Sequence, residues 1–361
     1  MKRFATLILV LCLVLTFTGC VSERTPEYII NEDWKVSAPE EVGLDAEELS
    51  RMTTRIEEQG EIDSVLIVKD GYLVLEEYYN DYDKEIQHEI YSCTKSIMSA
   101  LIGIALERGE IESIDEKVLD FFPEYEIENL DELKKRITIK DLLTMSSGLE
   151  WDESSVPYED EENDFFQMTR SDDWVKFILD KPVVAKPEEV FNYNSGNSHI
   201  LSAILQRATG MDTLSYAMKY LFTPLGVSSD DLSWEKDPQG IYFGGAFIRM
   251  RPRDMAKFGL LYLNNGRWNG NQIISEKWVK ESTLAYIKSD RPCNDYGYHW
   301  WIWRCGTKSF RALGYGGQLI IVVKELDMVI VFTAQIPAEQ TFNVYNYIIP
   351  YIFSAVNYLL V

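Results

Sequence analysis

The sequence predicts an α+β fold in which both ends of the chain build one antiparallel sheet and the middle forms a mainly helical lobe. Three observations predict it: strand-like alternation near the start, helical periodicity in the middle, and strand-like segments again from about Tyr296. With 361 residues, 46% of them hydrophobic, the chain can bury one core shared by two closely packed lobes. We expect the sheet lobe at about 35–85 and 290–361 and the helical lobe at about 86–289.

The first 34 residues are expected to precede this domain. Lys2 and Arg3 come before an apolar run, 7–17, and Phe17-Thr18-Gly19-Cys20 closes the segment. This pattern resembles a bacterial lipoprotein signal peptide over residues 1–20, with Cys20 as the lipid attachment site. Residues 21–34 are polar and predict a tether. A retained anchor helix is the alternative, although the run is short for a membrane span. Either reading places the domain outside the cytoplasm, anchored to the cell membrane by the lipid alone or secreted.

The sheet is expected to begin with a hairpin. Residues 62–68 and 72–79 alternate in a strand-like way around Asp70-Gly71, a pair that suits the positive φ angles of a tight turn. The helices are expected at 92–108, 139–145, 172–179, 198–207 and 254–263. The later strands are expected at 296–303, 309–313, 318–324 and 328–334. The final apolar segment, 343–361, contains a proline and several asparagines, so a helix lying on the sheet is favoured over a membrane span.

The charge of the chain excludes one class of partner. The formal net charge is −23, and no basic patch interleaved with aromatic residues offsets it, so nucleic-acid binding is not expected. Solubility or adaptation to salt explains the acidity, and steering of cationic substrates is the alternative. The acidic segment 150–164 is expected to be a solvated loop, with a calcium loop or a substrate rim as alternatives. No cluster of His, Asp and Glu predicts a metal site, and no cofactor is expected.

Three cysteines fall within the expected domain. Cys93, Cys293 and Cys305 lack the spacing of metal ligands. Cys293 and Cys305 flank a segment expected to be one strand, whose ends are too far apart to bridge unless the chain doubles back. Buried, inert thiols are therefore expected. A disulfide is the alternative in an oxidising compartment.

The chemistry is expected to start at the first long helix. Ser92-Cys93-Thr94-Lys95 places a hydroxyl and an amine three residues apart, on one helix face and within hydrogen-bond reach. A serine hydroxyl becomes a strong nucleophile when a neighbour takes its proton. The N-terminus of a helix also offers N–H groups to an oxyanion. Taken alone the motif is weak, because serine at a helix start is usually an N-cap.

Two further clusters strengthen this interpretation. Phe191-Asn192-Tyr193-Asn194-Ser195 precedes a helix and could bring a phenol to the nucleophile and a polar side chain to a substrate. Residues 314–318, Gly-Tyr-Gly-Gly-Gln, lead into an apolar strand, and glycines at a strand start allow close approach of a ligand. A core tyrosine in a polar turn and an ordinary Gly-rich loop are the plain alternatives. Ser-His-Asp catalysis is disfavoured, because no Gly-x-Ser-x-Gly motif is present and the chain has three histidines, His88, His199 and His299.

At these three clusters the chain resembles the serine β-lactamase and penicillin-binding-protein superfamily, class C-type branch. That branch includes esterases, D-amino-acid peptidases and hydrolases of 6-aminohexanoate oligomers. The likeness runs from about Val42 to the C-terminus and includes three further stretches, 137–149, 251–259 and 296–301. It implies the β-lactamase/transpeptidase-like fold.

The resemblance also implies roles for individual residues. Ser92 is then the nucleophile, Lys95 orients and deprotonates it, and Tyr193 is the general base and acid. Substrate contacts fall to Ser195, Tyr315, Gly317 and Gln318, with the N–H groups of Ser92 and Gln318 as the oxyanion hole. Two departures matter: Ser195 stands where β-lactamases commonly have Asn, and Tyr315 stands where they have a cation that binds a carboxylate. Both argue against an efficient β-lactamase.

The sequence therefore predicts an exported serine hydrolase that cleaves a small ester, amide or peptide through an acyl-serine. Two alternatives remain open. One is a D-alanyl-type peptidase or penicillin-binding protein of the same fold. The other is a non-catalytic binding or sensor module of the cell envelope, since a fold alone does not imply a function.

Overall fold

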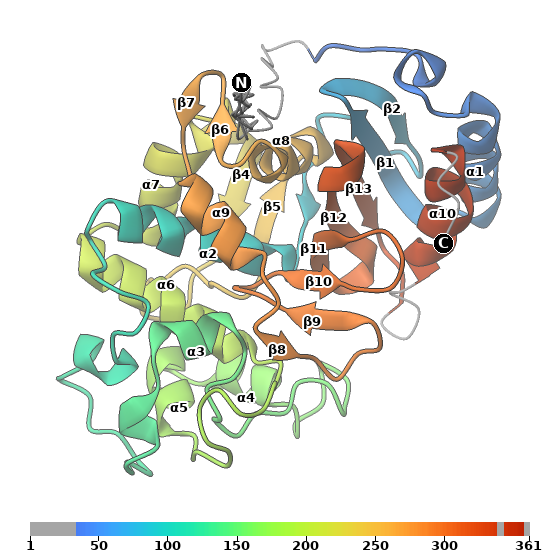
Figure 1. Cartoon of the computed structure of the whole chain (residues 1–361). Coiled ribbons are helices and arrows are strands. Elements are labelled where there is room, and N and C mark those ends of the chain that lie inside the picture. Colours follow the sequence, from blue (N-terminus) through green and yellow to red (C-terminus); the bar gives the residue numbers. More distant parts are fainter. Residues whose placement is uncertain (1–33, 338–342, 357–361) are drawn as a thin grey trace, which may run out of the picture.

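A computed structural model describes residues 34–337 and 343–356 (Figure 1). The predicted signal peptide, nearly all of the predicted tether and Cys20 lie outside these residues, as do the last five residues of the chain. Within the described ranges, no helix combines the length and apolar character needed to cross a membrane.

The predicted α+β fold is confirmed, with a sheet built from both ends of the chain. The eight strands of this sheet run in the order β2-β1-β13-β12-β11-β10-β9-β8, and each paired neighbour is antiparallel. Their bounds are β1 (Ile62–Lys69), β2 (Tyr72–Tyr78), β8 (Ile287–Lys288), β9 (Asn294–Tyr296), β10 (Trp301–Trp303), β11 (Ser309–Gly314), β12 (Gln318–Val323) and β13 (Met328–Ala334).

The helices cover both faces of that sheet and fill the lobe beside it (Figure 1). Their bounds are α1 (Ala46–Gln59), α2 (Cys93–Glu107), α3 (Ile139–Leu143), α4 (Asp164–Arg170), α5 (Trp174–Asp180), α6 (Ser195–Thr209), α7 (Thr213–Ala217), α8 (Pro252–Leu263), α9 (Glu276–Ser282) and α10 (Tyr345–Tyr347). Short strands complete the lobe: β3 (His88–Glu89), β4 (Leu232–Trp234), β5 (Ile248–Met250), β6 (Arg267–Trp268) and β7 (Asn271–Gln272).

The predicted first hairpin is present. Asp70 and Gly71 have φ angles of 51° and 77°, so the turn between β1 and β2 uses the left-handed region that this pair favours. On the far side of β1, Lys69 pairs with Met328 of β13, which joins the two ends of the chain. Helix α1 and the helical segment from Tyr345 to Phe353 lie together on one face of the sheet, as predicted for the C-terminal segment.

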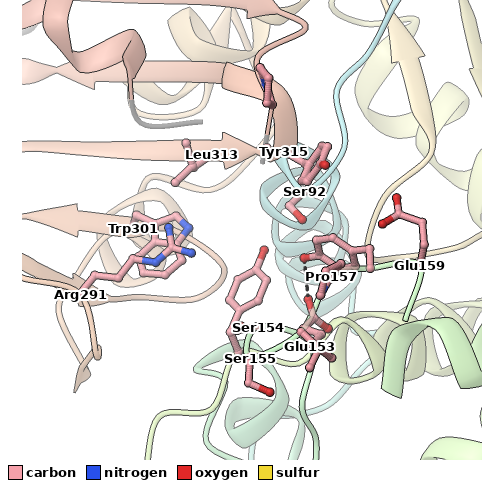
Figure 2. A pocket seen from close by; sticks show the side chains of 15 residues that line it. Ser92, Glu153, Ser154, Ser155, Pro157, Glu159, Arg291, Trp301, Leu313 and Tyr315 are labelled. Atoms are coloured by element: carbon pink, nitrogen blue, oxygen red, sulfur yellow. Dashed lines mark hydrogen bonds between the residues drawn. The ribbon is translucent and has the colours of Figure 1, made fainter. Parts of the chain in front are cut away.

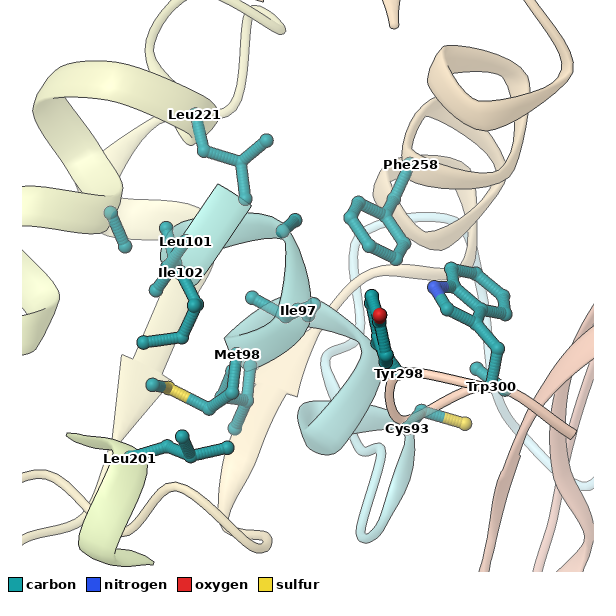
Figure 3. Close-up of a cluster of buried hydrophobic side chains, with 14 of the residues drawn as sticks. Cys93, Ile97, Met98, Leu101, Ile102, Leu201, Leu221, Phe258, Tyr298 and Trp300 are labelled. Atoms are coloured by element: carbon teal, nitrogen blue, oxygen red, sulfur yellow. The ribbon is translucent and has the colours of Figure 1, made fainter. Parts of the chain in front are cut away.

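Helix α2 is the centre of the larger core. Its residues from Cys93 to Ala105 are all buried, which is the pattern of a helix surrounded by other elements. Figure 3 shows its side chains between Leu201 and Leu221 on one side and Phe258 and Trp300 on the other. Because α2 is fixed on all sides, the residues at its N-terminus have little freedom to move.

One predicted strand and one predicted thiol pair are wrong. The segment 296–303 is not one strand: β9 ends at Tyr296, the chain turns at His299, whose φ is 58°, and β10 returns antiparallel to β9. This reversal brings the flanking residues Cys293 and Cys305 together, with Cα atoms 5.4 Å apart, and they form a disulfide. The third cysteine, Cys93, is a buried free thiol, and burial raises its pKa.

Candidate active site

Ser92 is presented at the start of α2. The chain enters this helix through Tyr91, whose φ of 45° is uncommon for a residue with a side chain. Ser92 stands at the N-cap position, yet its hydroxyl caps no N–H of the helix. Instead its Oγ lies 2.9 Å from Nζ of Lys95. The usual structural role of a serine at a helix start therefore does not account for Ser92.

Lys95 is buried, with 1% of its surface exposed, and its Nζ has three partners. It hydrogen-bonds to Oγ of Ser92, to Oγ of Ser195 and to the carbonyl oxygen of Gly245, each at 2.9 Å. An ammonium group has three protons to donate, so the side chain is fully satisfied. Among the residues that the structure describes, no carboxylate lies within 4.0 Å of this nitrogen.

Sequence reasoning missed Gly245. Its carbonyl reaches Lys95 because the segment before β5 runs against α6. A Cβ on the neighbouring Gly244 would lie 2.0 Å from the carbonyl oxygen of Ser198. Two adjacent glycines are the signal that could have pointed to this close approach.

The second cluster lies beside Lys95. Asn194 caps α6 by accepting a hydrogen bond from the N–H of Asn197, which fixes the chain around Tyr193 and Ser195. The ring of Tyr193 stacks on Trp301, with centroids 5.7 Å apart, and its centroid is 4.8 Å from Nζ of Lys95. The Tyr193 hydroxyl forms no hydrogen bond with any other described residue. Tyr193 and Ser92 line the same pocket.

The third cluster is only partly at this pocket. Gly314 and Tyr315 line it, whereas Gly317 and Gln318 do not. Gly314 passes so close to the start of α2 that a Cβ would lie 2.4 Å from the carbonyl oxygen of Ile90. After Tyr315 the chain enters β12, where the Gln318 side chain bonds to the carbonyl of Ala334 and the Gln318 carbonyl oxygen lies 3.6 Å from Sγ of Cys93, the residue after Ser92. The expectation that Gly317 and Gln318 contact the substrate therefore stays a prediction.

The pocket has a volume of about 680 Å³ and opens onto Ser92 (Figure 2). Its lining comes from the start of α2, the acidic loop, the turn before α6, the β9–β10 hairpin with the segment before it, the end of β11 with Tyr315, and Pro337 after β13. The lining includes Glu153, Tyr158, Tyr193, Arg291, Trp301 and Tyr315. These segments are far apart in sequence, so the cavity exists only in the folded chain.

Most of the acidic segment 150–164 is exposed, as expected for a solvated loop, but part of it also lines the pocket, as in the alternative of a substrate rim. Its residues 153–159 form one wall of the pocket, and Glu153 is 2% exposed. Tyr158 packs edge-on against Tyr315, with ring centroids 5.6 Å apart, and burial, followed by the charge of Glu153, raises the pKa of Tyr158. Aromatic and hydrogen-bonding contacts therefore hold Glu153 and Tyr158 at the pocket, while the acidic residues at 159–162 stay exposed.

The β9–β10 hairpin forms the opposite wall. The Arg291 guanidinium lies over the ring of Trp301, 4.5 Å from its centroid, and the Cys293–Cys305 disulfide closes the hairpin nearby. A second hollow of about 230 Å³ continues behind this wall. It shares Arg291, Trp301 and Leu313 with the first pocket and adds Trp303 and Tyr345.

The histidines have other partners. His199 bonds to Asp237 at 3.0 Å, with both side chains fully buried. His299 lies behind Lys95, where its Nε2 is 2.9 Å from Oγ of Ser198. Burial, with the charge of Lys95, lowers the pKa of His299 to about 3, so it is neutral at pH 7. Within the described residues, no group of His, Cys, Asp and Glu could hold a metal ion.

Comparisons with known proteins agree on one family. The family model described as Beta-lactamase matches residues 54–349. The 6-aminohexanoate-dimer hydrolase of Paenarthrobacter ureafaciens is 26% identical over 345 residues, which are 90% of this chain and 83% of that protein.

Two solved esterase-type structures share the fold. A family VIII carboxylesterase superposes with a TM-score of 0.69 at 16% identity, covering 90% of this chain and 99% of its own. EstCE1, a hydrolase with promiscuous acyltransferase activity, gives a TM-score of 0.71 at 14% identity, covering 86% and 98%.

Proposed function

This chain belongs to the beta-lactamase family, and from that premise we propose that it is a serine hydrolase that cleaves an ester or amide through an acyl-enzyme on Ser92. One observation carries the proposal. The Ser92 hydroxyl, at the edge of a large pocket, is free of helix capping and lies 2.9 Å from a buried lysine. A hydroxyl held this way is available to a substrate carbonyl rather than to the helix.

The proposed reaction has two halves. In the first, Ser92 Oγ attacks the carbonyl carbon while its proton passes to the phenol oxygen of Tyr193, acting as a phenolate base. The tetrahedral intermediate collapses, the leaving alcohol or amine takes that proton, and an acyl-serine remains. In the second half, Tyr193 takes a proton from water, the hydroxide attacks the acyl carbon, and Ser92 recovers its proton as the acid product leaves.

The developing oxyanion needs donors close to Ser92. The N–H of Ser92, at the N-terminus of α2, is one donor. We propose the main-chain N–H of Gln318 as the second donor. Gly314 packs directly against the turn that precedes Ser92, and its strand partner Gln318 has its carbonyl oxygen 3.6 Å from Sγ of Cys93, so both residues lie beside the start of α2.

The substrate we propose has an apolar or aromatic acyl part. Tyr193, Trp301 and Leu313 give the pocket a broad apolar wall, and the hollow behind Trp301 extends it. Rings of this kind bind flat or extended apolar groups through buried area. Tyr315 supplies no cation for the carboxylate of a β-lactam, so efficient β-lactamase activity is not expected.

Arg291 favours one second candidate, a D-alanyl-type peptidase. Its guanidinium lies at the pocket wall over Trp301, where it could receive the carboxylate at the end of a peptide. The two candidates differ in their behaviour toward penicillin. A peptidase forms a stable penicillin adduct, whereas an esterase turns over activated esters without one.

The experiment that tests the main proposal is labelling with a fluorophosphonate probe followed by mass spectrometry. We expect one adduct on Ser92 in the full chain and none in Ser92→Ala. An adduct that persists in Ser92→Ala would remove the proposal, and no labelling of the folded protein would favour the non-catalytic alternative. A panel of p-nitrophenyl esters, short amide oligomers and D-amino-acid peptides then identifies the substrate class.

We also propose that the enzyme works outside the cytoplasm, anchored through a lipid on Cys20. The apolar run that ends in Gly19-Cys20 supports export, and the Cys293–Cys305 disulfide suits an oxidising compartment. In a bacterial host, radiolabelled palmitate should be incorporated by the full chain and not by Cys20→Ser. Incorporation that does not depend on Cys20 would contradict this proposal.

A further inference from the structure

The buried Lys95 has no carboxylate in direct contact among the described residues. One carboxylate, that of Glu153, is connected to it through the Ser195 hydroxyl. We propose that Glu153 is a positioning residue that keeps Lys95 in its charged form and sets the direction of the hydrogen bonds around Ser92, acting through Ser195. This inference rests on the proposed function, in which Ser92 is the nucleophile. An isolated buried ammonium is costly, so a nearby negative charge has a large effect on it.

Four donors converge on Glu153. Its Oε2 accepts the N–H of Ser195 at 2.7 Å and the indole N–H of Trp151 at 2.6 Å. Its Oε1 accepts the Ser195 hydroxyl at 2.8 Å and the Tyr158 hydroxyl at 3.4 Å. The backbone and indole groups can only donate, and this number of donors suits an ionised carboxylate. With its oxygens filled in this way, Glu153 holds other protein groups and is not placed to bind the substrate.

The direction of each remaining hydrogen bond follows from that carboxylate. The Ser195 hydroxyl gives its one proton to Glu153, so its oxygen must accept from Lys95. The Gly245 carbonyl can also only accept. The third proton of the ammonium then points at Ser92, and the proton of Ser92 is directed away from the lysine.

As a consequence, Lys95 and Tyr193 have different roles in the proposed reaction. We expected Lys95 to deprotonate Ser92, but a lysine held as an ammonium cannot accept that proton. It stabilises negative charge instead, both on Ser92 Oγ and on the phenolate of Tyr193, whose ring centroid is 4.8 Å away. Tyr193 is left as the proton acceptor.

Other titratable groups face this network and bear on its pH dependence. The pKa of Tyr158 is raised by burial and that of His299 is lowered by burial, so both are neutral near pH 7. Cys93, below Lys95, is a thiol whose pKa is raised by burial. The other charged and phenolic groups around the pocket are Glu159, Arg291, Tyr193, Tyr296 and Tyr315. Glu153 is thus the acidic side chain that contacts the hydrogen-bond partners of Lys95.

Glu153→Gln tests the inference because it reverses one hydrogen bond. The amide oxygen can still accept from Ser195 N–H and Trp151, and the amide nitrogen then donates to Ser195 Oγ. Lys95 then loses the negative charge that balances it, and the Ser195 oxygen that it donates to already accepts a hydrogen bond from the new amide. We expect kcat on a p-nitrophenyl ester to fall about 10- to 100-fold with KM within about 3-fold. The alkaline limb of the pH–kcat profile should move about one unit lower.

Two comparisons separate this role from general damage. Glu150→Gln removes the same charge from an exposed position of the same loop. It should leave kcat within about 2-fold of the parent value and the alkaline limb of the pH profile at its parental position. In a double-mutant cycle, Glu153→Gln should lower kcat only slightly when Ser195→Ala has already removed the hydroxyl that connects Glu153 to Lys95. Glu153→Asp, which keeps the charge, should hold the alkaline limb near its parental position even if kcat falls.

The outcomes are distinguishable. If the parent labels on Ser92 but Glu153→Gln keeps its kcat and pH profile, or if the cycle is additive, the inference about Glu153 is overturned and the proposed function stands. If the parent shows no Ser92-dependent labelling, the proposed function itself fails. If Glu153→Gln does not fold, an alkaline limb displaced in Glu153→Asp as far as expected for Gln contradicts the inference.

Discussion

The two sides of the pocket are held together in different ways. On the helical side, Lys95 donates to three partners and Ser195 donates to Glu153, and these residues lie in or beside helices α2 and α6. On the opposite side, the wall is a short hairpin, β9–β10, closed by a disulfide and faced with Trp301 and Arg291. In the proposed enzyme the reacting groups therefore stand in or beside core helices, whereas the wall that we expect to select the substrate is a hairpin.

The largest expected effect comes from the helical side. Tyr193→Phe keeps the ring that stacks on Trp301 and removes only the hydroxyl. We expect kcat to fall about 10²- to 10⁴-fold, the range for losing an acid–base group, with the melting temperature nearly unchanged. Stopped-flow hydrolysis of a p-nitrophenyl ester measures it. An unchanged rate would show that Tyr193 has no role in proton transfer.

Breaking the disulfide should affect stability and leave the chemistry in place. The pair Cys293→Ser and Cys305→Ser opens a loop with a sequence separation of 12, which costs roughly 3 kcal/mol in the chain-entropy description. Urea unfolding measures this loss, and kcat on a short ester should stay within about 2-fold. Dithiothreitol should lower the stability of the parent and not that of the variant. Equal stability with and without reductant would contradict the prediction.

Low pH should lower the free energy of unfolding through His299, which is buried behind the site. Burial lowers the pKa of His299 to about 3, while in the unfolded chain it is near 6.5. Between these values the unfolded state binds more protons, so stability falls as the pH falls through 6.5 and continues to fall toward 3. His299 alone should cost about 2 kcal/mol by pH 5 relative to pH 7.5. Urea unfolding at the two pH values measures it, and His299→Gln should flatten the dependence.

The smallest effect is expected at the hollow behind Trp301. Trp303→Ala removes part of its lining, so KM for a long-chain or aromatic ester should rise about 3- to 10-fold. KM for the acetate ester, which does not reach the hollow, should change little. Steady-state kinetics on both esters gives the comparison. An equal rise for both would show that the hollow does not bind the acyl group.

The sequence predicted the helical side better than the hairpin wall. The helical period placed Lys95 one turn from Ser92, and the Asp70-Gly71 pair predicted the turn between β1 and β2. Both predictions depend only on residues close together in the sequence. The placement of Gly245 and Glu153 beside the site depends on contacts between distant segments. The turn at His299 was missed because its positive φ stands in a run of aromatic residues that reads as one strand.

The pairing of β1 with β13 has a consequence for how the chain is made. Lys69 meets Met328, so the first hairpin leaves the ribosome long before its partner strand exists. At about 5–20 residues per second, roughly 260 intervening residues take on the order of 13 to 50 s. During that time the edge of β1 that will pair with β13 is unpaired, and an unpaired apolar strand edge favours association with other unfolded chains.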